Sequence, residues 1–315
     1  MFYSHKPSSV FPRVVSILYY FRHVMSRMAT AYTRTLVHLV PPQGGVAKPA
    51  NFAQCILSAL QPNHTHSTLV NVELKDGKLL LSLPTPSSPP PVLLTHPSFC
   101  PAHCLTTGQA AALPEEAVRR GVDVGVVVLL ETADHQLLLT RRAKHMRTFP
   151  CTWVPPGGHV EEGEGLLEAG MRELEEETGL QPVVTTSSIL ALWESTYPYS
   201  LNMGMPKRHH IVTYYWVRSS ETSIALESRL RLDASEVDAA MWLSPTLARL
   251  VATGEAPPDC PPQVALTVVA AGGQEADSLP SSVLTRAAPE GGRDVERIST
   301  GTRYALQQWA VAREA

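Results

Sequence analysis

The sequence predicts an α+β fold in which a mixed helix-and-strand domain follows a smaller, β-containing N-terminal region. Three patterns predict it. Residues 122–130 form a nearly unbroken apolar run rich in valine, as expected of a strand buried on both faces. Residues 166–178 have helical spacing and end at Gly179. The proline-rich segment 84–91 separates this part of the chain from an earlier pair of strand-like runs.

Composition limits the class of protein. The chain has 315 residues, 44% of them hydrophobic, which is enough for a globular protein with one sizeable core. A net charge of −3 argues against a protein that coats nucleic acid. The five cysteines are few and odd in number, so we expect no disulfide framework and a reducing compartment. The run Cys100–Cys104 resembles half a zinc site, but no second Cys/His pair follows it.

The first residues have an unusual charge distribution. No acidic residue precedes Glu73, whereas six lysines and arginines do. Residues 1–27 are therefore a mitochondrial targeting segment, an extension ahead of a working start at Met28, or a start that lacks acidic residues by accident. We expect a cytoplasmic or nuclear protein, with a mitochondrial one as the alternative. The longest apolar run there, 14–21, is far shorter than the ~20 residues of a membrane span, so we expect no membrane partner.

Residues 28–115 are expected to form the small N-terminal subdomain and its linker. Strand-like runs at 68–72 and 79–81 flank Asp76-Gly77, the dipeptide that suits a type I′ turn, so 66–83 reads as a β-hairpin. The following segment, 84–91, is expected to be an extended linker.

Residues 116–252 are expected to form the main domain, and 253–315 a tail. Within the domain we expect further strands at 136–140, 189–193, 211–218 and 240–243. Gly179 should cap the helix at 166–178, and a second helix should run over 245–252 with Ser244 as its N-cap and Pro245 as its first residue. The tail carries a strand-like run, 264–270, and a terminal helix, 302–314.

The helix at 166–178 concentrates acidic residues. At about 100° per residue, Leu167, Met171, Leu174 and Thr178 would form its buried stripe. Glu173, Glu176 and Glu177 share another face, where like charges repel one another. A hard divalent cation offsets this repulsion, because such ions take oxygen ligands. The alternative interpretation is a solvated acidic helix face.

A longer pattern around this helix favours the metal site. Residues 158–180 match Gly-x5-Glu-x7-Arg-Glu-U-x-Glu-Glu-x-Gly-U, where U is aliphatic, at every defined position. A chance match in a chain of this length is on the order of one in a million. The segment thus resembles the Nudix box, and the chain is similar to Nudix hydrolases over about 120–250. The matching residues are Gly158, Glu164, Arg172, Glu173, Leu174, Glu176, Glu177, Gly179 and Leu180.

The resemblance implies a mixed β-sheet sandwiched between helices, a divalent cation (Mg²⁺ or Mn²⁺) and cleavage of a phosphoanhydride bond. It implies that Glu173, Glu176 and Glu177 bind the metal, with Glu173 or Glu176 doubling as general base. Arg172 would orient these carboxylates, while Gly158, Glu164 and Gly179 would be structural, Glu164 through a contact with Arg172. Glu236, in a loop before a strand, is a further candidate ligand or base; its alternative is simple surface exposure.

Five other residues are candidates for substrate contacts. Arg141, Arg142, Lys207 and Arg208 carry positive charge that could attract phosphates, although loop cations are usually only solvated. Trp193 could stack on a base, although burial in the core is the commoner fate of tryptophan.

Short runs of sequence outside the Nudix box resemble one subgroup of the family, whose members are long chains from vertebrates. These runs are 192–195, 207–211, 236–243 and 299–302. They imply action on methylated 5′ caps of RNA with release of a nucleoside diphosphate. Coenzyme A or another dinucleotide is the alternative substrate, and a non-catalytic nucleotide-binding module is the alternative of another class. We infer no obligate protein partner.

Overall fold

The computed structural model describes residues 34–42, 44–63, 66–286 and 295–314, so the proposed targeting segment, 1–27, lies outside the described residues. Within these ranges, no helix is long and apolar enough to cross a membrane. The helices are α2 (Ile56–Leu60), α3 (Pro101–Cys104), α4 (Thr107–Ala111), α5 (Glu115–Arg119), α6 (Leu166–Thr178), α7 (Ser223–Glu227), α8 (Pro245–Thr253) and α9 (Thr300–Glu314).

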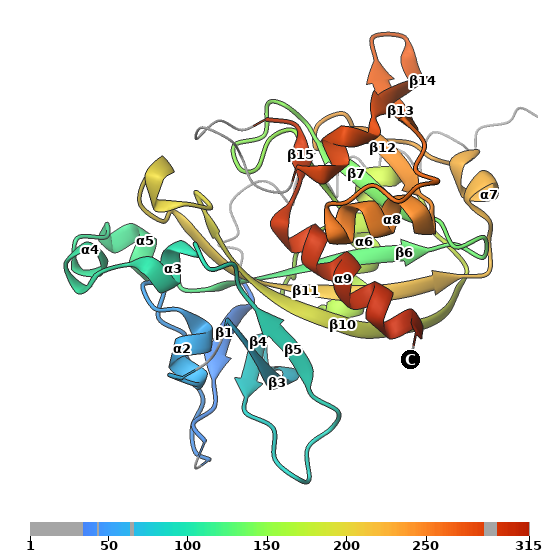
Figure 1. The fold of residues 1–315 in the computed structure, drawn as a ribbon. Helices are drawn as coiled ribbons and strands as arrows, with labels where there is room; N and C mark the ends of the chain where they lie inside the picture. Colours follow the sequence, from blue (N-terminus) through green and yellow to red (C-terminus); the bar gives the residue numbers. More distant parts are fainter. Residues whose placement is uncertain (1–33, 43, 64–65, 287–294, 315) are drawn as a thin grey trace, which may run out of the picture. The chain divides into compact units, whose positions relative to one another are not determined.

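One twisted sheet connects the described strands (Figure 1). Its path runs β14-β13-β12-β7-β6-β11-β10-β5-β3-β4-β1-β2, with the short β8, β9 and β15 paired alongside. The strands are β1 (Leu36–Leu39), β2 (Lys48–Pro49), β3 (Ser67–Lys75), β4 (Lys78–Ser82), β5 (Val92–Thr95), β6 (Asp123–Glu131), β7 (Leu137–Arg142), β8 (Thr152–Val154), β9 (Gly157–His159), β10 (Val184–Tyr197), β11 (Arg208–Ser219), β12 (Val237–Leu243), β13 (Gln263–Ala270), β14 (Gly273–Pro280) and β15 (Arg297–Ile298).

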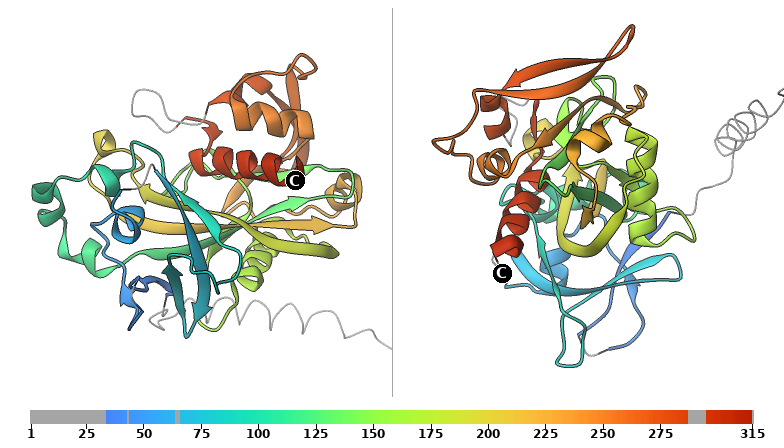
Figure 2. Two further views of the ribbon diagram at one scale, coloured as in Figure 1. Left: turned by 60° about the horizontal axis from the view of Figure 1, so that its bottom comes forward. Right: turned by 90° about the vertical axis from the view of Figure 1, so that its right-hand side faces the viewer.

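Helices cover both faces of the sheet. In Figure 2, α6 lies on one side of the central strands and α9 on the other. Helix α6 packs on β6 and β9, and α9 packs on β10 and α8. The sheet is mixed, because β11 pairs with β6 in parallel and with β10 in antiparallel. This is the predicted architecture, a mixed sheet sandwiched between helices.

The elements with strong local signals lie where the sequence predicts them. Helix α6 has the predicted bounds, and Gly179 ends it in the left-handed conformation with φ of 67°. Ser244 caps α8 by accepting a hydrogen bond from Leu247 N–H. The hairpin β3–β4 turns at Asp76 and Gly77, whose φ angles of 51° and 67° are those a type I′ turn requires.

The buried stripe of α6 differs from the prediction. Leu174 and Thr178 of the predicted stripe are buried, but Leu167 and Met171 are only half-buried. Leu166, Ala169 and Gly170 are buried instead. Small residues decide the difference, because a Cβ on Gly170 would lie 2.9 Å from Val128 Cγ2. The helix therefore lies very close to β6, and it turns its smallest residues toward that strand.

The N-terminal strands extend the same sheet. β5 pairs with β10 in parallel, and β1 contacts β6 at Leu36 and Asp123. The described residues from Arg34 onward thus form one compact unit. The domain boundary expected between residues 115 and 116 stays a prediction. Strands from both sides of it belong to the same sheet.

Candidate active site

Three carboxylates meet beside α6. Glu173, Glu177 and Glu236 each offer an oxygen, and these oxygens all lie within 4.8 Å of one another. Two come from successive turns of the helix and one from the loop before β12. We call these three residues the acidic cluster.

Glu177 lies deepest in the acidic cluster. Its side chain is 3% exposed and accepts hydrogen bonds from Thr140 Oγ1 at 3.0 Å and Gly157 N–H at 3.4 Å. Burial raises the pKa of Glu177 to about 8, although Arg142 acts against the shift. A carboxyl group in such a place stays protonated near neutral pH unless a cation is bound beside it.

Glu173 lies against the backbone of β9. A Cβ on Gly158 would lie 2.3 Å from Glu173 Oε1, so only glycine leaves room for this carboxylate. The predicted need for glycine at 158 is thereby explained by close approach, since its φ is not in the left-handed region. Burial raises the pKa of Glu173 to about 7, and the neighbouring Glu176 and Glu236 add to the shift while Arg172 opposes it.

Glu236 reaches the acidic cluster through its loop. Asp233 N–H donates to the carbonyl of Glu177 at 3.0 Å, and Glu236 N–H donates to Asp233. Ala143 N–H donates to the carbonyl of Glu236 at 2.8 Å, which fixes the other end of the loop to β7. The structure therefore brings Glu236 next to the helix.

Arg172 connects the remaining residues of the box. It donates to Glu164 at 2.6 Å, and to Glu173 and Glu176 at 3.0 Å each. The expected contact between Glu164 and Arg172 is present. Glu176 is the most exposed of the three predicted metal ligands, and the structure places it with Arg172 outside the acidic cluster. Its role as a ligand stays a prediction.

A cavity of about 210 Å³ adjoins the acidic cluster. Gly157 and Gly158, which contact Glu177 and Glu173, form part of its wall. Five aromatic residues are also among those that line it, namely Phe99, Phe149, Trp193, Tyr199 and Tyr214. The cavity thus reaches the acidic cluster through Gly157 and Gly158, while the three carboxylates themselves are not among its lining residues.

The structure places only some of the predicted substrate-binding residues at the cavity. Arg142 and Trp193 line the cavity, and the Trp193 ring also packs at 5.2 Å on Tyr304. Arg141 is held by Asp238 and Glu296.

The other two basic residues lie outside the cavity wall. Lys207 is exposed, and Arg208 lies 3.7 Å from Asp123. For all five candidates, contact with substrate stays a prediction.

Two features of the site escaped the sequence reasoning. The tail contributes Ser299, Thr300 and Gly301 to the cavity wall. Glu194 is fully buried between His209 and the N-terminus of α2, and accepts from Ile56 N–H at 2.7 Å. Both depend on contacts between distant segments. The only sequence signal was that runs 192–195 and 299–302 belong to the subgroup resemblance.

An acidic helix packs on a mixed sheet, and strand β9 places Gly157 and Gly158 against its carboxylates. This is the arrangement that the resemblance to Nudix hydrolases implies. The family model of the NUDIX domain matches residues 119–260. A protein from Danio rerio named m7GpppN-mRNA hydrolase NUDT17 is 43% identical over 287 residues, covering 88% of this chain and 95% of its own. The chain belongs to the Nudix family, and it is a hydrolase of acid anhydrides.

Two further relatives carry the same name. The one from Xenopus laevis is 41% identical and covers 88% of this chain and 94% of its own. The one from Homo sapiens is 42% identical and covers 76% and 77%. These matches confirm the subgroup that the sequence resembles. Nudix hydrolases generally use divalent metal ions, and oxygen donors such as those of the acidic cluster suit a hard dication.

Proposed function

We propose that this enzyme hydrolyses a phosphoanhydride bond in the methylated 5′ cap of RNA, releasing a nucleoside diphosphate, with Mg²⁺ or Mn²⁺ as its metal. The observation that carries the proposal is the acidic cluster beside β9, whose Gly157 and Gly158 also line a cavity with five aromatic residues. A methylated guanine is a flat cation, which aromatic faces attract. The names of the relatives, m7GpppN-mRNA hydrolase, support the same substrate.

The acidic cluster fits a divalent cation. Two of its carboxyl groups have pKa values raised to about 7 and about 8 by burial, so they lack a positive partner strong enough to keep them ionised. Glu173, Glu177 and Glu236 would hold the ion. When bound, it would neutralise charge on the phosphates and increase the acidity of a water molecule.

The protein's own groups would then position the reaction. Gly157 and Thr140 hold Glu177, and Arg172 and Gly158 fix Glu173. Water attacks a phosphorus, the bridging P–O bond breaks, and the departing phosphate keeps the electron pair. The water's proton passes to a carboxylate oxygen, for which Glu173 is the better placed of the two predicted bases because it lies in the acidic cluster. Arg142, on the cavity wall, would attract the phosphate chain.

The test is cleavage of a substrate panel by the purified full-length protein with Mg²⁺ or Mn²⁺. The panel holds RNA with a methylated cap, the same RNA with an unmethylated cap, coenzyme A, NADH, ADP-ribose and a diadenosine polyphosphate. We expect the highest kcat/KM on methylated capped RNA, with methylguanosine diphosphate as the released product.

Two results would contradict the proposal. A higher kcat/KM on coenzyme A or a dinucleotide would assign the enzyme to that substrate class. Metal-dependent binding of capped RNA without any cleavage product would instead support a non-catalytic binding module.

A further inference from the structure

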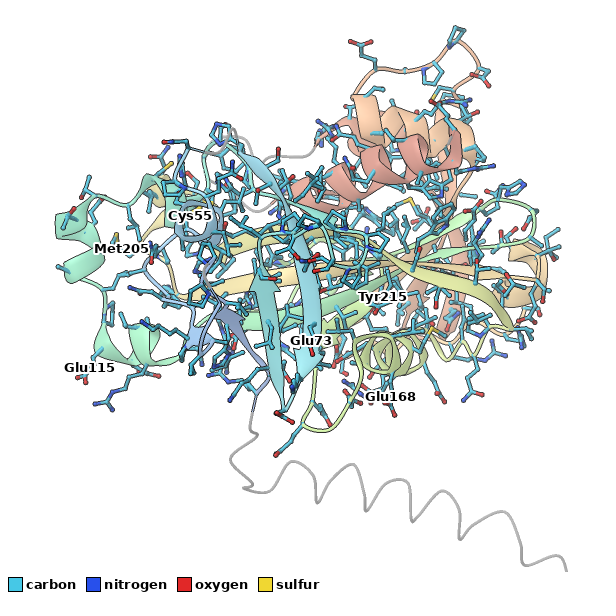
Figure 3. The ribbon with its side chains drawn as sticks, turned by 90° about the horizontal axis from the view of Figure 1, so that it is seen from below. Cys55, Glu73, Glu115, Glu168, Met205 and Tyr215 are labelled. Atoms are coloured by element: carbon cyan, nitrogen blue, oxygen red, sulfur yellow. The ribbon has the colours of Figure 1, made fainter. Side chains whose placement is uncertain are left out.

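A second group of metal-type donors lies in the N-terminal part of the fold. Cys55, His96 and His103 each offer one donor atom, and these atoms all lie within 4.8 Å of one another. The residues come from three segments, since Cys55 caps α2, His96 follows β5 and His103 belongs to α3. Figure 3 labels Cys55 at the start of its helix. We call this group the Cys-His cluster.

The Cys-His cluster combines burial with access. Cys55 and His96 are each 2% exposed, whereas His103 is exposed. An ion could therefore enter past His103 and be held by donors from the interior. Thiolate and imidazole are the ligands of zinc, while carboxylates suit Mg²⁺ and Mn²⁺. The acidic cluster and the Cys-His cluster thus differ in chemistry as well as in place.

The His96 ring makes a hydrogen bond that suits a metal ligand. Its Nδ1 lies 2.8 Å from the carbonyl of Pro97. A carbonyl only accepts hydrogen bonds, so Nδ1 carries a proton, and in the neutral ring Nε2 keeps the lone pair that can bind metal. Metal-bound histidines commonly donate their other nitrogen to such a carbonyl, which fixes the ring.

A third imidazole adjoins the other two. The ring centroid of His66 lies 5.3 Å from that of His96 and 5.6 Å from that of His103, and the latter two lie 4.9 Å apart. His66 lies outside the group of donors that are all within 4.8 Å of one another, so its exposed side chain would have to shift to supply a fourth donor. Structural zinc sites are closed by four nitrogen or sulfur ligands.

The Cys55 sulfur is held in place from two sides. Its Sγ accepts from Ser58 N–H at 3.4 Å, and its thiol donates to Glu194 Oε2 at 3.4 Å. The backbone N–H stabilises negative charge on sulfur. Zinc binding would release this thiol proton to water, and the buried Glu194 carboxylate would then leave a negative charge near the dication.

We propose that Cys55, His96 and His103 bind a structural Zn²⁺, with His66 as the fourth ligand. Spacing alone gave only Cys100–Cys104, and of that run His103 takes part in the Cys-His cluster while Cys104 lies outside it. The zinc would join α2, β5 and α3. Pro97, Phe99 and Cys100, which lie between two of the ligands, line the catalytic cavity. The site would therefore fix one wall of that cavity.

The test is the zinc content of the purified full-length protein, freed of any histidine tag and dialysed, by mass spectrometry. We expect about one zinc per chain in the wild type, and at least a tenfold lower zinc affinity in Cys55→Ser and in His103→Ala. Cobalt added in place of zinc should give a thiolate-to-cobalt charge-transfer band in the wild type and none in Cys55→Ser.

Matched controls separate this site from its surroundings and from the active site. Cys104→Ser changes the thiol next to His103, which lies outside the Cys-His cluster, and should keep the zinc. Glu177→Gln should also keep it, because that variant alters only the acidic cluster.

The proposal is overturned by two results. One is a wild type that holds no zinc and whose thermal unfolding temperature does not rise when zinc is added. The other is zinc that remains in both ligand variants at the wild-type affinity. If Cys55→Ser does not fold, His103→Ala decides, because an exposed side chain can be shortened without opening the core.

Discussion

At the scale of single residues, the site contains a carboxyl group whose ionisation is unfavourable without a bound cation. Glu177 is buried, and its two hydrogen-bond donors, Thr140 and Gly157, are both neutral. Ionising it in the metal-free protein is unfavourable, as its raised pKa shows. The sequence motif predicted Glu173 and Glu177 as metal ligands. It could not fix which way the side chain of Glu176 points, because spacing on a helix sets an angle and not a rotamer.

Gly158→Ala tests the close approach of Glu173. The new Cβ would lie 2.3 Å from Glu173 Oε1 and would displace the carboxylate. We expect kcat/KM to fall at least about tenfold, or about 1.4 kcal/mol in the barrier, with the thermal unfolding temperature little changed. Gly165→Ala is the control, because its Cβ would meet nothing closer than 3.9 Å. Equal activity of Gly158→Ala and wild type would refute the steric argument.

The variants Glu236→Gln and Glu176→Gln test whether the acidic cluster or the Nudix-box motif identifies the metal ligands. Glu236 lies in the acidic cluster and Glu176 lies beside Arg172. We therefore expect Glu236→Gln to raise the metal concentration for half-maximal activity at least about tenfold, and Glu176→Gln to raise it less. A metal titration of activity measures both. A larger effect in Glu176→Gln would show that the motif, and not the observed arrangement, identifies the ligand.

At the scale of elements, helices and turns with their own local signals could be predicted from the sequence. Elements that depend on contacts between distant segments could not. Helix α6 and the turn of the β3–β4 hairpin carry their own end signals, Gly179 and Asp76-Gly77, and lie as predicted. The three-residue strands β8 and β9 carry none. They exist because β7 and β6 offer them backbone partners. The approach of Glu236 likewise depends on a loop bonded to the end of α6, which no local pattern encodes.

Gly170→Ala tests the contact between α6 and β6. Alanine gains up to ~1 kcal/mol of helix propensity over glycine. Its Cβ would, however, lie 2.9 Å from Val128 Cγ2 and 3.2 Å from Val126 Cγ2, on stiff β-branched side chains. We expect a net loss of about 1–2 kcal/mol in the free energy of unfolding, measured in urea.

The matched background for this prediction is Val128→Ala. Removing the valine methyl groups makes room for the new Cβ, so Gly170→Ala should cost less there than in the wild type. The same loss in both backgrounds would mean that crowding against Val128 is not the cause.

At the scale of the whole molecule, the N-terminal region and the box-bearing domain share a core and a sheet. The buried Glu194 of β10 accepts from the backbone of α2, and β1 contacts β6. The sequence predicted the hairpin of that region but not its place in the main sheet, because pairing between strands far apart in the chain leaves no local pattern. The tail likewise joins the cavity through Gly301.

The raised pKa values of the acidic cluster predict how stability depends on pH. Glu173 and Glu177 have folded-state pKa values of about 7 and about 8, above their ordinary 4.5. The folded state therefore binds protons more tightly than the unfolded state. The stabilisation from these protons is complete below about pH 4.5 and is lost as pH rises through 7 and 8.

We expect the metal-free protein to lose on the order of a few kcal/mol of unfolding free energy between pH 5 and pH 8. Glu177→Gln should show a smaller loss, and added Mg²⁺ should restore the wild type at pH 8, because metal binds the ionised carboxylates. Urea unfolding in a chelator at the two pH values measures this. An identical pH dependence in wild type and variant would contradict the prediction.

The central claim is that the acidic cluster carries out the hydrolysis, and turnover of Glu177→Gln tests it most directly. The control is Glu175→Gln, two residues along the same helix and outside the acidic cluster. With methylated capped RNA and saturating Mn²⁺, we predict at least an about 100-fold lower kcat for Glu177→Gln, or about 2.7 kcal/mol, and nearly wild-type turnover for Glu175→Gln. A folded Glu177→Gln protein that cleaves at the wild-type rate would contradict the account.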